Sequence, residues 1–406
     1  MPKLPLEGIR IADFTWWIAG TMATRLMAAY GAHVIKIEST IQRDQIRETA
    51  QVPGGTGSLN ASPGFNGINP GKMSMTLNPK HPKGLEVARR IISISDIVAD
   101  NMTWGAMARL GLGYDDLVKI KPDIIVLTMP VMGPGGPYTH FTGNGEQIAA
   151  AAAMHHLTGY PEEIGMAPGP VYPDWASNPY HAVTAVMAAL YHKHKTGKGQ
   201  HIILSQYESV VNVTALPIMD YSVNGRIQTR KSNRSPYGAP HGIYRCQGED
   251  RWCAIAVYTD QEWQGMRRAM GDPEWIQSDK YSTVLGRSEN VDELERLLEE
   301  WTSERSAEEV MKTLQAHGVA AGVVQNGRDL LENDPQMKAR NHYARMDHPE
   351  IGNMAFDDYP FKLSKTQGRL TRHAPLIGEH NDFVIGELLG MSEDEVNELI
   401  IEGVLE

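Results

Sequence analysis

Hydrophobic positions in the first 130 residues alternate between strand-like and helix-like spacing. Short apolar runs typical of buried strands occupy residues 9–14 and 33–38. Between them, apolar residues at three- and four-residue intervals over residues 21–30 predict a helix that Gly31 ends. The same order is repeated downstream, with helices expected over 82–94 and 114–120 and strands at 96–99 and 123–129. Strands that alternate with helices predict an α/β fold, a Rossmann-like parallel sheet covered on both faces.

Between residue 130 and Gly225 the chain is predicted to be mainly helical. Helices are expected at about 145–157, 178–194 and 207–223, with one strand at 201–205. Two stretches rich in Gly, Ser, Asn and Pro, residues 50–71 and 133–137, predict loops.

The pattern changes after Gly225, where a hairpin at 242–247 and 252–257 precedes three amphipathic helices. These helices are expected at 260–271, 291–302 and 306–317. We therefore expect a large domain over 1–224, a smaller α+β domain over 225–325 and a C-terminal segment over 326–406. A strand over 352–361 and two helices are expected in that last segment.

Composition narrows the class of protein. The 406 residues are 41% hydrophobic and carry a net charge of -11, which is typical of a soluble globular protein and unlike a general nucleic-acid binder. The apolar runs at 148–154 and 182–191 fall short of the roughly 18 residues that a membrane span needs. No signal peptide is recognisable, and the only two cysteines, Cys246 and Cys253, indicate reduced thiols and a cytoplasmic location.

Several familiar chemistries lack their sequence signatures. Residues 14–20, which follow the first strand, do not have the G-x-G-x-x-G spacing of a dinucleotide site, and no phosphate-binding P-loop or G-x-S-x-G elbow occurs. The histidines form no cluster with metal-ligand spacing, so no metal is expected. Lys193, Lys195 and Lys198 could meet phosphates, but we favour a solvated turn at a helix C-terminus.

Asp174 is the strongest candidate for chemistry among the acidic residues. It lies between Pro173 and Trp175 in a Pro-rich loop that leads into an apolar helix, with little competing charge nearby. A carboxylate in such surroundings can be a nucleophile or a base. The alternative is a helix N-cap, although Ser177 and Asn178 suit that role better for a helix beginning at Pro179. The residues alone leave both interpretations open.

Ordered motifs along the whole chain give it a family resemblance. The chain resembles the class III coenzyme A (CoA) transferases, which include formyl-CoA transferase, carnitine CoA-transferase and the α-methylacyl-CoA racemases. The matching stretches are residues 6–13, 31–38, 99–101 with 105–111, Asp174, 194–200 and 375–381. The resemblance implies a two-domain fold whose final helices return to the large domain, in a dimer of two chains interlinked like rings.

Site residues follow from the resemblance by position. Asp174 matches the nucleophile, and Glu146 matches an acidic residue near it. Seven residues match positions that contact CoA or line its nucleotide and pantetheine: Trp17, Ala19, Leu77, Asn101, Met102, Arg109 and Leu110. Leu77, Met102 and Leu110 could equally be core residues, and Arg109 could form a surface ion pair.

The resemblance implies transfer of CoA from an acyl-CoA donor to a carboxylic acid, with no metal. Asp174 would form a mixed anhydride and then an aspartyl-CoA thioester, while the Gly/Pro loops at 133–137 and 235–242 could stabilise oxyanions and exclude water. Ser39, Ile18 and residues 235–238 depart from formyl-CoA transferase, which argues against oxalate or formate chemistry. The racemases carry a histidine within the stretch that is 142–146 here; its absence favours transfer over racemisation.

The substrate class is suggested by two further stretches. Residues 156–161 and 220–226 are similar to the benzylsuccinate and related succinyl-CoA-dependent branch, so we expect succinyl-CoA as donor and a larger, partly apolar acid as acceptor. Five aromatic residues could form an acyl pocket or belong to the core: Trp16, Trp17, Tyr172, Trp175 and Tyr180. Some members of that branch pair two related subunits, so the alternatives are a homodimer, a heteromer, a CoA-binding subunit without catalysis, or a racemase-type isomerase.

Overall fold

The computed structural model describes residues 3–49, 57–169 and 171–405. The chain forms two compact units. The large unit is built from residues 1–155, 167–228 and 338–406, and the small unit from 156–166 and 229–337. The domain boundaries suggested by the sequence remain a prediction.

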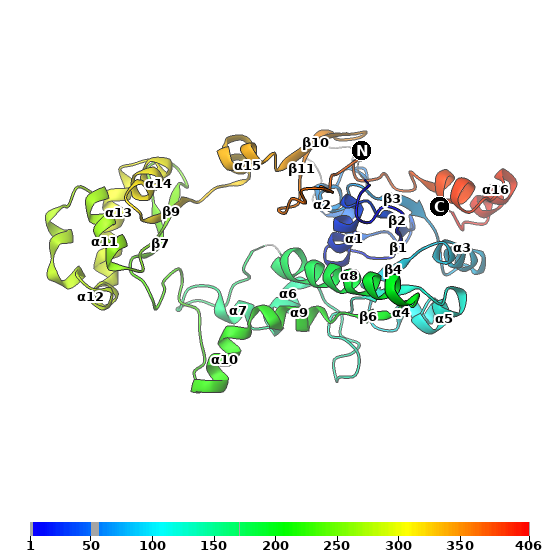
Figure 1. Ribbon diagram of the computed structural model, residues 1–406, viewed down its shortest axis with the longest axis horizontal. Helices are drawn as coiled ribbons and strands as arrows, with labels where there is room; N and C mark the ends of the chain where they lie inside the picture. Colours follow the sequence, from blue (N-terminus) through cyan, green and yellow to red (C-terminus); the bar gives the residue numbers. More distant parts are fainter. Residues whose placement is uncertain (1–2, 50–56, 170, 406) are drawn as a thin grey trace. The chain divides into compact units, whose positions relative to one another are not determined.

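The large unit is organised around a six-stranded parallel sheet with the order β3-β2-β1-β4-β5-β6 (Figure 1). Its strands are β1 (Arg10–Asp13), β2 (His33–Glu38), β3 (Met73–Thr76), β4 (Ile97–Asp100), β5 (Ile125–Thr128) and β6 (His201–Ile203). The parallel α/β architecture expected from the alternating pattern is thus confirmed. Strand β3 has no counterpart in the prediction, because Met-Ser-Met-Thr is short and carries no apolar β-branched residue.

Helices cover both faces of this sheet. Paired residues Ala12, Ile35 and Val98 face one core, which α3 (Pro82–Ser93), α5 (Tyr114–Ile120) and α16 (Glu393–Ile401) cover. Their neighbours Ile11, Val34 and Ile97 face the other core, beneath α1 (Ala19–Ala29) and α8 (Asn178–Thr196). Figure 1 shows α1 and α3 on opposite sides of the strands. Successive strand residues point to opposite faces of the sheet, and both alternating sets are apolar here, so each face has an apolar core.

Away from Asp174, the sequence-based expectations for three helical or loop segments of the large unit are wrong. The loop expected over 50–71 contains helix α2 (Pro63–Ile68), which Ser62 caps through Phe65; residues 50–56 of that stretch lie outside the described residues. The helix expected at 145–157 is split into α6 (Gly145–Ala151) and α7 (Met154–Leu157), and Ala153 between them has φ +67°. The helix expected at 207–223 is α9 (Gln206–Val213) followed by α10 (Ala215–Asn224). Pro217 explains the second break, because it has no N–H for the helical ladder.

The remaining elements of the large unit are short. Helix α4 (Ala106–Arg109) follows β4, and β10 (Tyr343–His348) pairs with β11 (Gly352–Asp357) in an antiparallel hairpin. Strand β11 ends four residues before the predicted 361. Helix α15 (Pro335–Arg340) lies where the chain returns from the small unit.

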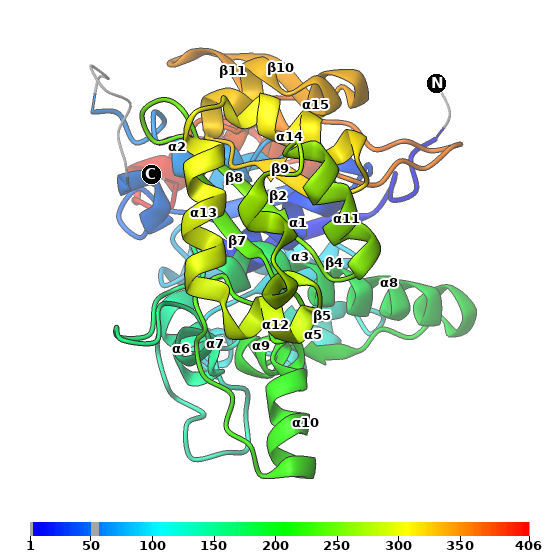
Figure 2. The ribbon, with the colours of Figure 1, turned by 90° about the vertical axis from the view of Figure 1, so that its left-hand side faces the viewer.

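The small unit packs helices on a three-stranded antiparallel sheet with the order β7-β8-β9 (Figure 2). Its strands are β7 (His241–Arg245), β8 (Trp252–Ala256) and β9 (Ala320–Val323), and its helices are α11 (Asp260–Ala269), α12 (Val284–Glu289), α13 (Val291–Ser303) and α14 (Ala307–Ala316). The predicted hairpin and all three predicted helices are present. Cys246 and Cys253 are buried and free.

Candidate active site

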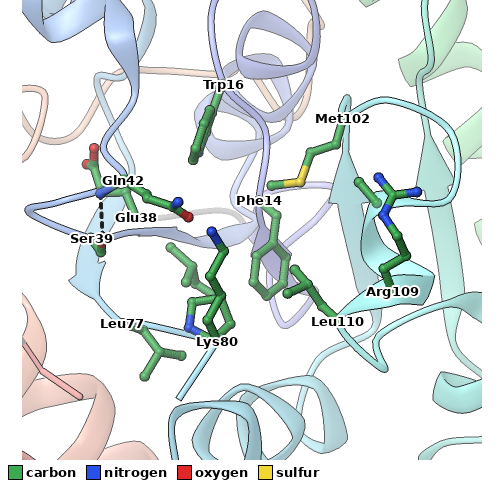
Figure 3. A pocket seen from close by; sticks show the side chains of 13 residues that line it. Phe14, Trp16, Glu38, Ser39, Gln42, Leu77, Lys80, Met102, Arg109 and Leu110 are labelled. Carbon is green, nitrogen blue, oxygen red and sulfur yellow. Dashed lines mark hydrogen bonds between the residues drawn. The ribbon is translucent and has the colours of Figure 1, made fainter. Parts of the chain in front are cut away.

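A pocket of about 370 Å³ opens at the carboxyl ends of four neighbouring strands (Figure 3). Phe14 follows β1, Ser39 follows β2, Leu77 follows β3 and Met102 follows β4, and all four line the pocket. The strand order reverses between β1 and β4. Ligands of open α/β sheets bind in the crevice at such a reversal.

The pocket combines apolar walls with two cationic side chains. Arg109 comes from the end of α4 and Lys80 from the turn after β3, and the Lys80 side chain extends into the pocket beside Phe14 (Figure 3). Within the described ranges, no ion pair involves either side chain. Glu38 also lines the pocket, but its carboxylate is bound 2.7 Å from the buried Arg47 guanidinium. The two free cations are therefore suited to phosphate groups.

Four of the seven CoA-contacting residues expected from the resemblance line this pocket: Leu77, Met102, Arg109 and Leu110. Leu77, Met102 and Leu110 also pack in or against the sheet core. These three residues therefore have both positions that the sequence allowed, in the core and at the pocket. Arg109 forms no ion pair among the described residues, which removes its alternative role. Contact of these residues with CoA remains a prediction.

The other three predicted residues lie in or against the loop after β1. Asn101 Oδ1 accepts the Trp16 N–H at 2.8 Å, and Asn101 Nδ2 donates to the Trp16 carbonyl at 2.7 Å. Trp17 has φ +58°, and its N–H donates to Asp44 Oδ1 at 2.9 Å. Ala19 begins α1 directly afterwards. The Asn101 side chain thus fixes the backbone that presents Trp16 to the pocket.

Buried ion pairs lie beneath this loop, and sequence reasoning missed them. Lys72 Nζ is 3.1 Å from Asp13 Oδ2, and Lys36 Nζ is 2.9 Å from Asp44 Oδ2. Lys36 Nζ also donates to the Thr15 carbonyl at 2.7 Å. Burial lowers the pKa of Lys72 to about 8, although Asp13 opposes that effect. In the sequence, the only sign of these ion pairs is a charged residue in or beside each strand. Such a residue looks the same as one that faces solvent.

Asp174 lies in a π-helical turn, η2 (Pro173–Ser177), that continues into α8. The loop expected at this point is therefore wrong; Pro179 has no N–H to donate, which favours a widened turn. The N-cap interpretation is also wrong, since no side chain caps η2 or α8.

The Asp174 carboxylate is almost fully buried, with 5% of the residue exposed. Burial raises its pKa to about 6, and the negative charge of Glu146 acts in the same direction. Asn178 Nδ2 lies 3.3 Å from Asp174 Oδ1, and the Gly145 backbone N–H donates a second hydrogen bond. A carboxylate held by neutral donors, without a cation, keeps its nucleophilic character while remaining ionisable near neutral pH.

Helix α6 brings a second carboxylate and a close backbone approach to Asp174. A Cβ atom on Gly145 would lie 2.2 Å from Val171 Cγ1 and 2.7 Å from Asp174 Oδ2, so only glycine fits. Glu146, next in the chain, lies close enough to Asp174 for its negative charge to raise the pKa of the Asp174 carboxyl. The two carboxylates predicted for the site are therefore close together. His155 Nε2 lies 3.3 Å from Glu146 Oε2. Sequence reasoning missed His155, which is nine positions after Glu146. The break between α6 and α7, which the sequence did not predict, is what brings the two side chains together.

The aromatic residues proposed for an acyl pocket are not core residues. Trp17, Tyr172, Trp175 and Tyr180 are each between 37% and 42% exposed, and Trp16 lines the pocket at the strand ends. Their exposure removes the alternative of core packing for these four. Exposed aromatic side chains near a buried carboxylate are available to contact a substrate.

Three other features of the described residues bear on expectations from the sequence. Among the described residues, no three His, Cys, Asp or Glu side chains are grouped closely enough to hold a metal ion. No described helix has the length and apolar character needed to cross a membrane. Lys193 lies in the last turn of α8 as expected, but its side chain is largely buried and paired with Asp96 and Asp123, so the solvated position favoured from the sequence is wrong for this lysine.

Comparison with known proteins places the chain in a family. The sequence profile of CoA-transferase family III matches residues 6–381. The β subunit of succinyl-CoA--L-malate CoA-transferase from Chloroflexus aurantiacus is 29% identical over 98% of this chain and 97% of its own. Formyl-CoA:oxalate CoA-transferase from Streptomyces coelicolor is 29% identical over the full length of both chains.

A solved structure agrees with this placement. A CAIB/BAIF family protein from Brucella suis superposes with a TM-score of 0.86 at 27% identity, covering 95% of this chain and all of that one. The family resemblance inferred from the motifs is thereby confirmed. The chain belongs to CoA-transferase family III and is a CoA-transferase, with CoA as the group that it transfers.

Proposed function

We propose that this enzyme moves CoA from succinyl-CoA to a larger, partly apolar carboxylic acid, with Asp174 as the covalent nucleophile. The observation that carries the proposal is the buried Asp174 carboxylate, which accepts hydrogen bonds from Asn178 and Gly145 and has a pKa near 6. Two relatives from Chloroflexus aurantiacus, named for L-malate and D-citramalate as acceptors, use succinyl-CoA by name. The exposed aromatic residues Trp17, Tyr172, Trp175 and Tyr180 supply apolar surface for the acyl groups.

The reaction proceeds through three covalent intermediates: a mixed anhydride with the donor acyl group, an aspartyl-CoA thioester, and a mixed anhydride with the acceptor. An oxygen of Asp174 attacks the thioester carbonyl carbon, a C–O bond forms, the C–S bond breaks and CoA leaves as the thiolate. The thiolate then attacks the aspartyl carbonyl carbon of the mixed anhydride, forming the aspartyl-CoA thioester and releasing succinate. The acceptor carboxylate attacks this thioester, and the released thiolate attacks the acceptor acyl carbon. Acceptor-CoA leaves, and Asp174 is again a carboxylate.

The pocket at the strand ends would hold the nucleotide end of CoA. Arg109 and Lys80 bind phosphate groups, while Trp16, Met102 and Leu110 line the path of apolar portions. Asn101 acts by fixing the Trp16 backbone. Elements η2 and α1 pack together, so the loop that ends at α1 links this pocket to the turn that carries Asp174.

The assembly is proposed to contain two chains interlinked like rings. Helix α10 supports this proposal, because it buries none of its residues and leaves Leu216, Tyr221 and Val223 59–81% exposed. The partner is either a second copy or a related subunit; two relatives are named as α and β subunits. The free thiols Cys246 and Cys253 fit a cytoplasmic location.

The test is chemical trapping on Asp174. The purified protein is treated with succinyl-CoA and then hydroxylamine, and its peptides are analysed by mass spectrometry. We expect a hydroxamate on the peptide that contains Asp174 and none in the Asp174→Asn variant. An unmodified peptide with each of several acyl-CoA donors would contradict the nucleophile, and modification by other donors but not succinyl-CoA would contradict the donor.

Racemisation of a 2-methylacyl-CoA is the second candidate, supported by one observation. His155 is paired with Glu146 beside Asp174, so a second proton-transfer group lies at the site despite the missing histidine at 142–146. Incorporation of solvent deuterium at the α-carbon of such a thioester, lost in both Asp174→Asn and His155→Ala, would favour the racemase over the transferase.

A further inference from the structure

Four buried polar side chains lie behind Asp174, and the reaction described above uses only one of their contacts. Ser177, Asn178, Gln206 and Ser209 are between 0% and 5% exposed and come from η2, α8 and α9. Buried polar groups are costly unless each finds a partner, so a connected set of them restricts the geometry of whatever it contacts.

Counting donors and acceptors fixes the orientation of the Asn178 amide. Two acceptors, Asp174 Oδ1 and Gln206 Oε1, lie 3.3 Å from one end of the amide, so that end is Nδ2 and the other end, Oδ1, accepts from Ser209 Oγ at 2.8 Å. Gln206 Nε2 donates to the Met129 carbonyl at 2.7 Å, which leaves Gln206 Oε1 as the end that faces Asn178. Both Asn178 N–H groups and its oxygen are therefore committed, and one N–H is committed to the carboxylate.

Ser177 completes the network on the far side. Since the single Ser209 hydroxyl hydrogen is used on Asn178, the Ser177 hydroxyl is the donor to Ser209, at 2.6 Å from its Oγ and 2.9 Å from its carbonyl oxygen. No alternative hydrogen placement satisfies Asn178 and Ser209 together. The network holds the Asn178 NH₂ group against one oxygen of the nucleophile.

We propose that Asn178 is a catalytic hydrogen-bond donor that holds Asp174 Oδ1 as the retained oxygen and stabilises negative charge there whenever the aspartyl carbonyl is attacked. This inference rests on the proposed role of Asp174 as nucleophile. Oδ2 forms the new bond to the donor acyl carbon, and Oδ1 becomes the carbonyl oxygen of the anhydride and of the thioester. Gln206 and Ser209 are positioning residues that act through Asn178.

The charge on Oδ1 explains why such a donor favours the transition states. In the anhydride and in the thioester Oδ1 is a neutral carbonyl oxygen. When the CoA thiolate or the acceptor carboxylate adds to the aspartyl carbon, the electron pair of the C=O bond moves onto Oδ1; it returns as the old bond to the leaving group breaks. The hydrogen bond from Asn178 is thus stronger during both attacks than in either intermediate, which is the requirement for lowering a barrier.

The experiment separates the two half-steps in Asn178→Ala. Wild type and variant are mixed with succinyl-CoA without acceptor, and rapid quenching follows free CoA thiol and CoA bound covalently to the protein. We expect formation of protein-bound CoA to slow on the order of 10²-fold, the scale for one oxyanion donor. Release of free thiol changes much less, so thiol accumulates transiently. The acidic limb of the rate profile moves to higher pH, because the lost donor had favoured the ionised carboxylate.

Asn69→Ala is the matched control. Asn69 is fully buried in the large unit, and its Nδ2 donates to the Phe65 carbonyl, so its truncation removes the same atoms from a buried site outside the network. We expect Asn69→Ala to leave the ratio of the two half-steps and the pH profile unchanged. If Asn178→Ala does not fold, Ser209→Ala takes its place, since it frees the Asn178 amide to rotate; the same changes are expected in smaller size.

The outcomes distinguish this inference from the proposed function. If wild type forms CoA bound at Asp174 and the variants leave the ratio of half-steps and the pH profile unchanged, the role of Asn178 is overturned while the nucleophile stands. If wild type forms no adduct at Asp174 with any donor, the proposed function fails and this inference fails with it. Slowing of both half-steps to the same extent, with no change in the pH profile, also overturns the inference, because it indicates a structural role.

Discussion

The raised pKa of Asp174 predicts that the proposed nucleophile destabilises the folded enzyme when it is ionised. An aspartate with a folded pKa of about 6 and an ordinary value of 3.8 is protonated more readily when folded than when unfolded. Between these two pH values the folded state binds more protons, so stability falls as pH rises. At pH 7 the ionised group costs about 3 kcal/mol, since each pKa unit is worth about 1.36 kcal/mol; at pH 5 it costs about 2 kcal/mol.

Asp174→Asn removes this cost, and with the proposed nucleophile lost we expect transferase activity to be lost as well. The variant places an amide NH₂ against the N–H groups of Asn178 or Gly145, which opposes part of the gain by about 1–2 kcal/mol at every pH. The difference between pH 5 and pH 7 is therefore the informative quantity, and we expect the stability of the variant relative to wild type to rise by about 1 kcal/mol over that interval.

The assay is urea unfolding of both proteins at pH 5, 6 and 7, followed by circular dichroism. Asp220→Asn provides the control: its carboxylate is bound by Arg226, which holds the pKa of Asp220 well below its usual range. Asp220 is then ionised in both states throughout this interval, so its effect stays constant with pH. A constant difference for Asp174→Asn, or one that falls as pH rises, would refute the reasoning that burial of the charge dominates at Asp174.

Three further predictions concern the geometry around the site. Gly145→Ala should lower the transfer rate by about 10²-fold or more, because the new Cβ displaces the Asp174 carboxylate, whereas Gly67→Ala, with open space at its Cβ, should leave it unchanged. Arg109→Gln and Lys80→Gln should each raise the KM for acyl-CoA about tenfold but leave kcat and the KM for an acyl-pantetheine thioester unchanged; equal effects on both thioesters would contradict phosphate binding. Asn101→Ala should lower the free energy of unfolding by about 2 kcal/mol and weaken CoA binding measured by calorimetry, since it frees the loop after β1; unchanged affinity would contradict that link.

Helix and strand positions in the first 130 residues were largely predictable, because hydrophobic spacing records which side of each element is buried. Strand β2 and helix α5 match their predicted bounds, and α1 ends where Gly31 required. Strand β3 was missed, since its Met and Ser residues carry no period and are buried only because β2 pairs with them. The breaks at Ala153 and Thr214 were missed for a related reason: the apolar pattern continues across both.

The amino-acid sequence by itself determined the family, the parallel α/β fold and the identity of Asp174 as the candidate nucleophile, because motifs and apolar spacing are properties of neighbouring residues. Only the tertiary structure decided what surrounds that carboxylate. Gly145 and His155 come from other helices, and their distances to Asp174 and Glu146 depend on how α6, α7 and η2 pack. Asn178 is four residues from Asp174 in the same continuous helical stretch, but the amide is held by Gln206 and Ser209, which are distant in sequence, as is Gly145. The pKa of Asp174 is set mainly by burial, which no local pattern encodes.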